Sequence, residues 1–187
     1  MAMAGGTMKA RDVDAEQEAH GKPLRGADPG ALAERVLTAN SISVPASLLL
    51  HISVALRNLL GDGGTAVLYH LSREGAKAWC TAVKKDLRLD DGDPALVQLV
   101  EELAVRNNWG KMRFSRIDPV SATCDVSLQG CLECSHVRMS DGPVCHFIRG
   151  VVAGFASVLL GVDVHAVETG CKAQGEASCQ FEVKRRV

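Results

Sequence analysis

This sequence contains few aromatic residues and no excess of positive or negative charge. Together these two features argue against a protein that binds nucleic acid. Phe, Trp and Tyr make up 4% of the 187 residues, and 21 Lys and Arg stand against 22 Asp and Glu, for a formal net charge of −1. Proteins that bind nucleic acid usually carry a basic surface interleaved with aromatic side chains. We therefore expect no direct binding to nucleic acid.

Long apolar runs are also missing. The longest run, residues 151–162, is too short to cross a bilayer, which takes about 20 apolar residues. The first 20 residues lack the uninterrupted apolar core of a signal peptide. We expect a cytoplasmic protein without a membrane span.

The residues that are present predict one domain after a flexible N-terminal tail. Residues 1–30 combine Gly, Ala and charged side chains, whereas residues 31–187 contain enough apolar residues to bury one core. A helix is expected at 31–39, capped near Asp28, and apolar residues recur at helical spacing in 48–60, 76–87 and 95–107. The glycine-rich segment 61–64 should end the first of these three, and Gly75 should interrupt the chain before the second. Periodicity does not decide between helix and strand for residues 65–74.

A different pattern begins after Gly110. Short alternating segments at 112–117, 120–128, 162–169 and 179–185 predict strands, and residues 143–160 predict a long helix that begins with Pro143. The expected fold class is α+β: N-terminal helices packed on a small antiparallel sheet of about four strands, with one long inserted helix.

Seven cysteines carry the clearest chemical signal. An odd number cannot pair completely, and in the cytosol such a set indicates metal binding or redox chemistry before structural disulfides. Glu168 ends one predicted strand, Cys171 lies in the following turn and Cys179 begins the next strand, so a hairpin would bring all three together. Cys145 lies in the first turn of the long helix, where free N–H groups favour a thiolate.

Three thiolates and one carboxylate would complete a tetrahedral shell for zinc, with iron as the alternative. The cysteines can also be small buried apolar residues without a metal. A second pair, Cys131 and Cys134, is separated by two residues and followed by His136. With Cys145 and His146 this pair could build a rival metal site; it could also be a redox dithiol or two unrelated thiols. Cys80 and Cys124 are expected in the interior.

The order Pro143-Val144-Cys145, a glycine-containing helix and the segment ETGCKAQGEASCQFEV (168–183) resembles the 4-vinyl reductase domain family over about residues 46–187. In the phenol- and xylene-sensing activators of this family, zinc is held by a cysteine that opens the long helix and by a Glu-x2-Cys-x7-Cys hairpin. The resemblance implies zinc ligation by Cys145, Glu168, Cys171 and Cys179. This chain shows no ATPase segment and no helix-turn-helix, so we do not expect it to be such an activator itself.

The resemblance also implies a fold, shared with vesicle-tethering subunits, that encloses an apolar cavity for a hydrophobic small molecule. Trp109 and Phe147 are the preferred ligand-binding residues, and the further candidates are Tyr69, Trp79 and Phe114; all five could instead fill the core. Gly150 and Gly154 lie on one face of the long helix, where they would allow close helix packing. That face could form a homodimer interface.

These features favour a sensor domain with a structural zinc that signals to a partner protein. A metal held by four protein ligands has no open position for a substrate, and no flavin or nicotinamide fingerprint is present, so binding is expected rather than catalysis. The alternatives are an accessory role in reduction of a tetrapyrrole vinyl group, a cysteine-based redox switch, and an assembly scaffold.

Overall fold

The computed structural model describes residues 46–135, 137 and 139–186, together with residues 28, 30, 31, 33 and 34. Most of the predicted tail, much of the predicted helix at 31–39, and His136 therefore lie outside the described residues. Residues 30, 31, 33 and 34 are helical, and the backbone N–H of Ala31 donates to the Asp28 carboxylate at 3.0 Å, as expected for the cap.

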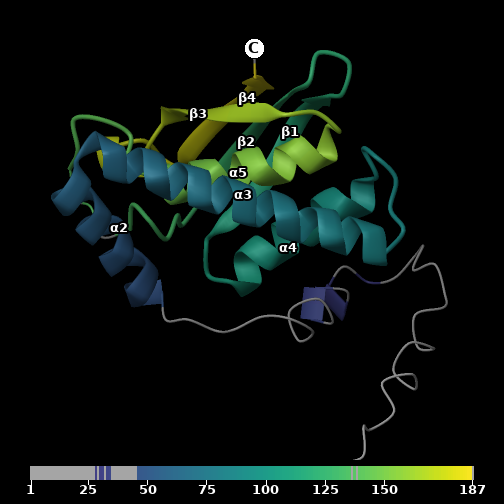
Figure 1. Cartoon of the computed structure of the whole chain (residues 1–187), viewed down its shortest axis with the longest axis horizontal. Coiled ribbons are helices and arrows are strands. Elements are labelled where there is room, and N and C mark those ends of the chain that lie inside the picture. The colour runs from purple at the N-terminus through teal and green to yellow at the C-terminus, as the bar shows by residue number, and fades with distance from the viewer. Residues whose placement is uncertain are drawn as a thin grey trace, which may run out of the picture.

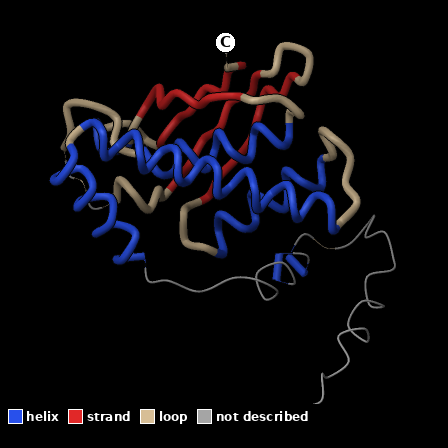
Figure 2. Tube along the Cα trace, viewed as in Figure 1, coloured by secondary structure: helices blue, strands red, loops and turns tan. Residues whose placement is uncertain are grey.

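The described chain forms helices followed by an antiparallel sheet that a further helix interrupts. Helices α2, α3 and α4 span Ala46–Leu60, Asp62–Asp86 and Pro94–Arg106, strands β1 and β2 span Lys111–Asp118 and Thr123–Gln129, helix α5 spans His146–Leu159, and strands β3 and β4 span Val164–Gly170 and Cys179–Arg185. The strand order is β1-β2-β4-β3. Figures 1 and 2 show α5 lying between the sheet and α3, with α2 and α4 outside this pair. The α+β fold predicted from the sequence is thus confirmed.

Alternation along the two central strands, β2 and β4, builds the inner face of the sheet. Their buried side chains meet as cross-strand pairs: Cys124 with Val183, Val126 with Phe181, and Leu128 with Cys179. Helix α5 packs against this layer and is buried along nearly its whole length. Although α5 is apolar, its 14 residues are too few to cross a membrane. None of the described helices is both long enough and apolar enough to do so.

Two glycines allow α5 to lie directly on α3. A Cβ atom at Gly150 would lie 1.9 Å from Ser72 Oγ and 2.3 Å from the Tyr69 carbonyl oxygen, and one at Gly154 would lie 2.4 Å from the Arg73 carbonyl oxygen. The close packing expected of these glycines is therefore found within the chain. The expectation that their face forms a homodimer interface is wrong, because α3 occupies it.

Helix α3 differs from the prediction. It runs for 25 residues without a break at Gly75 and begins at Asp62, one residue after Gly61, so Gly63 and Gly64 are helical as well. A glycine costs about 1 kcal/mol within a helix, and the packing of α3 along α5 outweighs that cost. Helix α5 likewise begins at His146 rather than at Pro143.

Candidate metal centre and ligand cavity

The end of the β3–β4 hairpin delivers three potential metal ligands to the start of α5. Glu168 belongs to the inward-facing side of β3, which it shares with Val164 and Ala166. Cys171 follows β3 directly and precedes a short 3-10 turn, which closes at Gly175 with a φ of 97°. Cys179 is the first residue of β4, and Cys145 immediately precedes α5.

These four residues converge in the interior. Cys145 Sγ lies 3.8 Å from Cys171 Sγ and 3.6 Å from Cys179 Sγ, and the donor atoms of all four residues lie within 4.8 Å of one another. Two sulfur ligands of a tetrahedral zinc ion, each about 2.3 Å from the metal, lie about 3.8 Å apart. The structure therefore brings together the predicted ligand set at a spacing suited to zinc.

Glu168 supplies a test of whether a metal fits. One of its carboxylate oxygens, Oε2, accepts a hydrogen bond from the backbone N–H of Cys145 at 3.0 Å, whereas Oε1 is buried and has no hydrogen-bond partner in the described part of the chain. Burial raises the pKa of this carboxyl group. A buried oxygen without a partner is costly, and a cation among the three neighbouring sulfurs would satisfy it.

Cys131 and Cys134, the second cysteine pair, lie beside Cys145 and Cys179 of the predicted site. Cys131 Sγ lies 3.4 Å from Cys145 Sγ, and Cys134 Sγ lies 3.4 Å from Cys179 Sγ. These four sulfurs form a second group in which all donor atoms lie within 4.8 Å of one another. His146, expected as a ligand of a rival site, belongs to neither group among the described residues; the pair instead shares Cys145 and Cys179 with the predicted site.

The cysteines of this cluster differ in the direction in which their pKa values are shifted. Hydrogen bonds from Cys131, Cys145 and Cys179 stabilise the thiolate of Cys134 and lower its pKa, while the contacts of Cys145 with Cys131, Cys134 and Cys179 raise the pKa of Cys145. A divalent metal favours the thiolate form of every sulfur it binds.

The two remaining cysteines behave differently from the cluster. Burial raises the pKa of both Cys80 and Cys124 to about 12, which leaves them as neutral interior thiols. Both are buried, as expected, and neither belongs to either group of potential ligands.

Glu133, inside the Cys131–Cys134 loop, was not anticipated from the sequence. Its buried carboxylate accepts hydrogen bonds from the backbone N–H groups of Phe147 at 3.1 Å and Ile148 at 3.0 Å, in the first turn of α5. Burial raises its pKa to about 7, although these two hydrogen bonds oppose the shift. The acidic residue before a helix was visible in the sequence, but only the folded loop shows which N–H groups it reaches.

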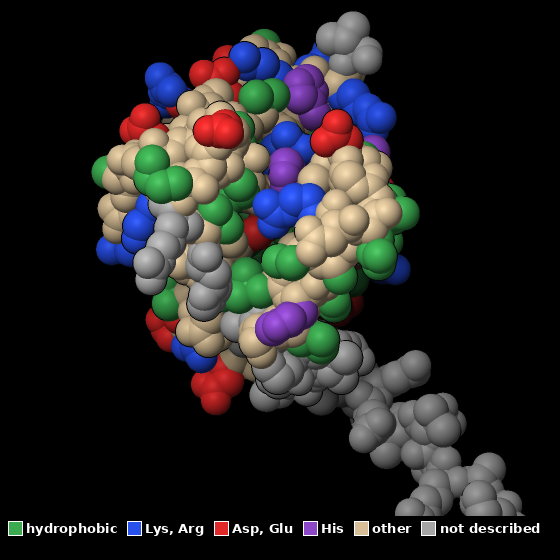
Figure 3. All heavy atoms as spheres, turned by 90° about the vertical axis from the view of Figure 1, so that its left-hand side faces the viewer, with side chains coloured by type: hydrophobic (Ala, Val, Ile, Leu, Met, Phe, Trp, Pro, Cys, Tyr) green, Lys and Arg blue, Asp and Glu red, His purple; other side chains and the backbone are tan. Residues whose placement is uncertain are grey.

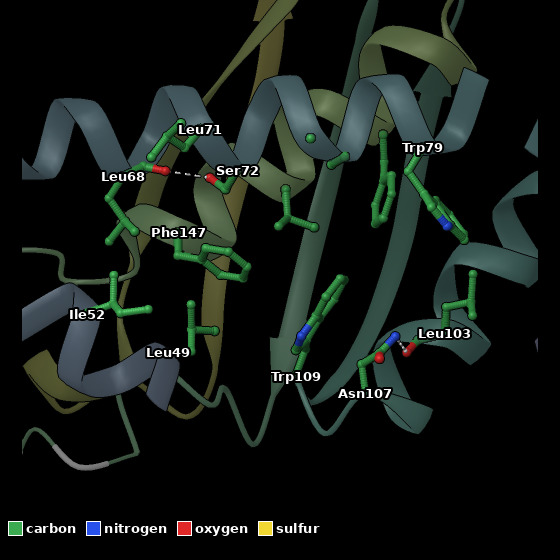
Figure 4. A pocket seen from close by; sticks show the side chains of 14 residues that line it. Leu49, Ile52, Leu68, Leu71, Ser72, Trp79, Leu103, Asn107, Trp109 and Phe147 are labelled. Carbon is green, nitrogen blue, oxygen red and sulfur yellow. Dashed lines mark hydrogen bonds between the residues drawn. The ribbon is translucent and has the colours of Figure 1, made fainter. Parts of the chain in front are cut away.

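A cavity of about 480 Å³ lies on the other side of the first turns of α5. It is bounded by α2, α3, the end of α4 and α5, and is lined by Leu49, Ile52, Leu68, Leu71, Ser72, Gly75, Ala76, Trp79, Leu103, Asn107, Trp109, Phe147, Val151 and Phe155. Figure 4 shows Trp109 and Phe147 projecting towards each other across it; their ring centroids are 6.1 Å apart. Trp79 also lines the wall, whereas Tyr69 and Phe114 do not.

The cavity wall is apolar and open at one side. Ser72 Oγ donates to the Leu68 carbonyl oxygen and Asn107 Nδ2 donates to the Leu103 carbonyl oxygen, both at 2.9 Å, so these polar groups are largely used within the wall (Figure 4). Ile52 is 44% exposed and Leu71 is 65% exposed, which places the opening between α2 and α3. Figure 3 shows a hollow on this side of the molecule, with hydrophobic side chains in its lower part and Lys, Arg and His side chains above them.

The part of the chain that contains the cysteine cluster matches a known protein family. Residues 124–185 match the 4-vinyl reductase domain family, and all six potential ligands fall within this range. Two uncharacterized proteins of Methanocaldococcus jannaschii are similar: one is 30% identical over 79 residues, or 42% of this chain and 49% of that protein, and the other is 24% identical over 142 residues, or 75% and 76%. The chain thus spans about half the length of the first of these relatives.

Solved structures share the fold at low sequence identity. The phenol-responsive sensory domain of the transcription activator PoxR, solved with phenol, matches with a TM-score of 0.72 at 16% identity, over 88% of this chain and 91% of that one. A vinyl-4-reductase family protein from Methanocaldococcus jannaschii gives 0.56 at 16%, over 97% and 100%. A trafficking protein particle complex subunit 3 from Naegleria fowleri, covalently bound to palmitic acid, gives 0.54 at 10%, over 76% and 95%.

Proposed function

We propose that this chain, in which residues 124–185 form a 4-vinyl reductase domain, is a sensor for a hydrophobic small molecule that signals to a partner protein. The observation that carries the proposal is the apolar cavity beside α5, whose volume falls in the range of small-molecule sites. Two proteins of similar fold, the PoxR domain and the trafficking subunit, hold phenol and palmitic acid. A molecule with a large apolar surface and few polar groups suits this wall.

The proposal includes a structural metal, zinc or alternatively iron, bound by Cys145, Glu168, Cys171 and Cys179. Four protein ligands would leave no open position for a substrate, so the metal would supply folding free energy rather than catalysis. It would fasten the β3–β4 hairpin to the start of α5. The spacing of the donors and the unpartnered oxygen of Glu168 support this assignment.

Hydrogen bonds join the cysteine-bearing loop beside the proposed metal site to two residues of the cavity wall. The ring of Phe147 lines the cavity, while its backbone N–H is held by Glu133 in the cysteine-bearing loop. The backbone N–H of Leu132 in the same loop donates to the carbonyl oxygen of Trp109 at 3.1 Å. A backbone shift at either residue upon ligand binding would therefore reach the loop, which would give the sensor a route for signalling.

Filling the cavity from α3 tests the ligand-binding role. Gly75 lines the cavity and has no atom within 4 Å of where its Cβ would lie, so Gly75→Leu should occupy the space without a clash. We expect at least about a tenfold loss of affinity for phenol or palmitate. The helix should be slightly more stable, since leucine is a better helix former than glycine. Trp fluorescence titration and thermal unfolding would measure both effects.

Gly63→Leu is the matched control, because Gly63 also lies in α3 with open space around it but does not line the cavity. Its affinity for both probes should equal that of the wild type. If neither phenol nor palmitate binds the wild-type protein, or if Gly75→Leu binds them equally well, the cavity is not their binding site.

A cysteine-based redox switch is the second candidate, favoured by the close contacts among five buried thiols. Oxidation of the thiolates would release the metal. Unchanged metal content after mild peroxide treatment would exclude it. We also propose a cytoplasmic homodimer, and sedimentation of the purified chain would measure its assembly state.

A further inference from the structure

Two cysteines belong to both groups of potential metal ligands. Cys145 and Cys179 occur with Cys131 and Cys134 in one group and with Glu168 and Cys171 in the other. We infer that the centre binds two divalent metal ions, bridged by the thiolates of Cys145 and Cys179. This inference rests on the metal site of the proposed function and adds a second ion to it.

The two donor groups share two sulfurs, as two tetrahedra that share one edge would require. Such a pair needs six donors, two bridging and two terminal on each metal, and the described part of the chain supplies five thiols and one carboxylate in these roles. The bridging sulfurs of Cys145 and Cys179 lie 3.6 Å apart. Their contacts with the terminal sulfurs of Cys131, Cys134 and Cys171 measure 3.4, 3.4 and 3.8 Å. The distances of 3.6 and 3.8 Å lie near the sulfur–sulfur edge of about 3.8 Å for tetrahedral zinc, and the two of 3.4 Å are shorter than that edge.

Charge balance does not oppose the second ion. One divalent ion with three thiolates and one carboxylate leaves two formal negative charges in a buried site. Binding a second divalent ion to Cys131 and Cys134 forms two metal–sulfur bonds and releases the two thiol protons to solvent, so the formal charge stays the same. The second ion therefore adds no net charge to the interior, where uncompensated charge is costly.

The Cys131–Cys134 loop is held in place for this role. Gly130, with a φ of 67°, turns the chain out of β2, and the hydrogen bonds of Leu132 to Trp109 and of Glu133 to the first turn of α5 hold the loop from both sides. Cys131 is 1% exposed and Cys134 is 2% exposed. The loop thus presents both thiols, buried and fixed in position, to the sulfurs of Cys145 and Cys179.

Metal stoichiometry is the first test. The full chain, reduced and loaded with zinc and then freed of excess ions, should contain two zinc ions per chain by elemental analysis. The double variant Cys131→Ser/Cys134→Ser should retain one. The matched control Cys80→Ser/Cys124→Ser alters two buried cysteines outside the cluster and should retain two.

Cadmium provides a second test that needs no variant. The protein loaded with ¹¹³Cd should give two resonances, one for four sulfur ligands and one for three sulfurs and an oxygen, with scalar coupling between them through the bridging sulfurs. One metal per chain with a single resonance would overturn the binuclear centre and leave the proposed single site standing. Two resonances without coupling would overturn the bridge. No bound metal would overturn this inference and the metal site of the proposed function together.

Discussion

The metal centre and the apolar cavity both adjoin the first turns of α5, but they are built in opposite ways. The centre gathers short side chains from separate segments of the chain, and all six of its residues are buried. The cavity is formed by large apolar side chains of packed helices, and part of its rim is exposed. Metal–ligand bonds tolerate little displacement, whereas an apolar wall can repack around occupants of different shape. If the metal is bound as proposed, the centre would fix the position of α5 and the cavity would supply the adaptable surface.

Among the variants considered, removal of a cysteine that belongs to both donor groups should have the largest effect on stability. Cys179 belongs to both donor groups, so Cys179→Ser should abolish metal binding and, with it, cooperative folding, because structural zinc contributes on the order of 10 kcal/mol. Metal analysis and thermal unfolding followed by circular dichroism would measure the loss. If a single metal ion and a cooperative transition survive, the two groups do not depend on Cys179.

Cys124→Ser is the matched control in the neighbouring strand β2. Cys124 faces the same core, opposite Val183 of β4, but belongs to neither group of potential metal ligands. Burying a hydroxyl there should cost about 1–3 kcal/mol while leaving the metal content unchanged. A loss of metal in this control would show that general destabilisation, rather than ligation, controls metal binding.

Disruption of the packing between α3 and α5 should have the next largest effect on stability, since both the candidate metal centre and the cavity depend on this packing. Gly150→Ala places a methyl group against Ser72 and the Tyr69 carbonyl oxygen, and the required shift of the helices should cost about 3 kcal/mol. Gly63→Ala, in open space on α3, should instead stabilise the protein by up to about 1 kcal/mol. Denaturant unfolding of both variants would measure the contrast. Equal stability of the two variants would contradict the close packing.

The sequence was informative about the candidate metal centre because its potential ligands lie at the ends of strongly patterned elements. Glu168 and Cys179 bound a hairpin, and Cys145 precedes a helix, so their approach could be predicted from the chain alone. For Cys131 and Cys134 the sequence left an approach to Cys145 as one of several alternatives, and their approach to Cys179 could not be predicted, because it depends on the path of an irregular loop. Helix α3 was interrupted in the prediction because Gly75 disfavours a helix locally, and only packing against α5 reverses that preference.

The cavity was less predictable for the same reason. An aromatic residue at helical spacing can fill a core or line a cavity, and periodicity does not separate these outcomes. Trp109 and Phe147 do face a cavity, while Phe114, chosen by the same reasoning, packs elsewhere against the core. Whether Trp109 and Phe147 contact a ligand stays a prediction. The partner of Gly150 and Gly154, another helix of the same chain, also depended on tertiary structure.

The smallest predicted effect lies beyond the other end of α5, away from the metal centre. Asp163 pairs with Lys77 at 2.5 Å and with Arg73 at 2.7 Å, and its side chain is 45% exposed. The hydrogen bond from Lys77, followed by the interaction with Arg73, lowers the pKa of Asp163. A lowered pKa means that the stabilisation is present above the usual aspartate pKa of about 4 and is lost as the pH falls through the folded-state value.

Asp163→Asn should therefore cost roughly 1 kcal/mol at pH 7, because Asp163 and Lys77 are partly exposed and the buried Arg73 keeps Glu74 as a partner. The variant and the wild type should converge in melting temperature as the pH falls below the lowered pKa of Asp163. Metal content and phenol affinity should not change, since this contact only fastens α3 to the chain after α5. A variant that loses metal at pH 7 would show that the two ends of α5 are coupled, and the centre alone would then not fix the position of the helix.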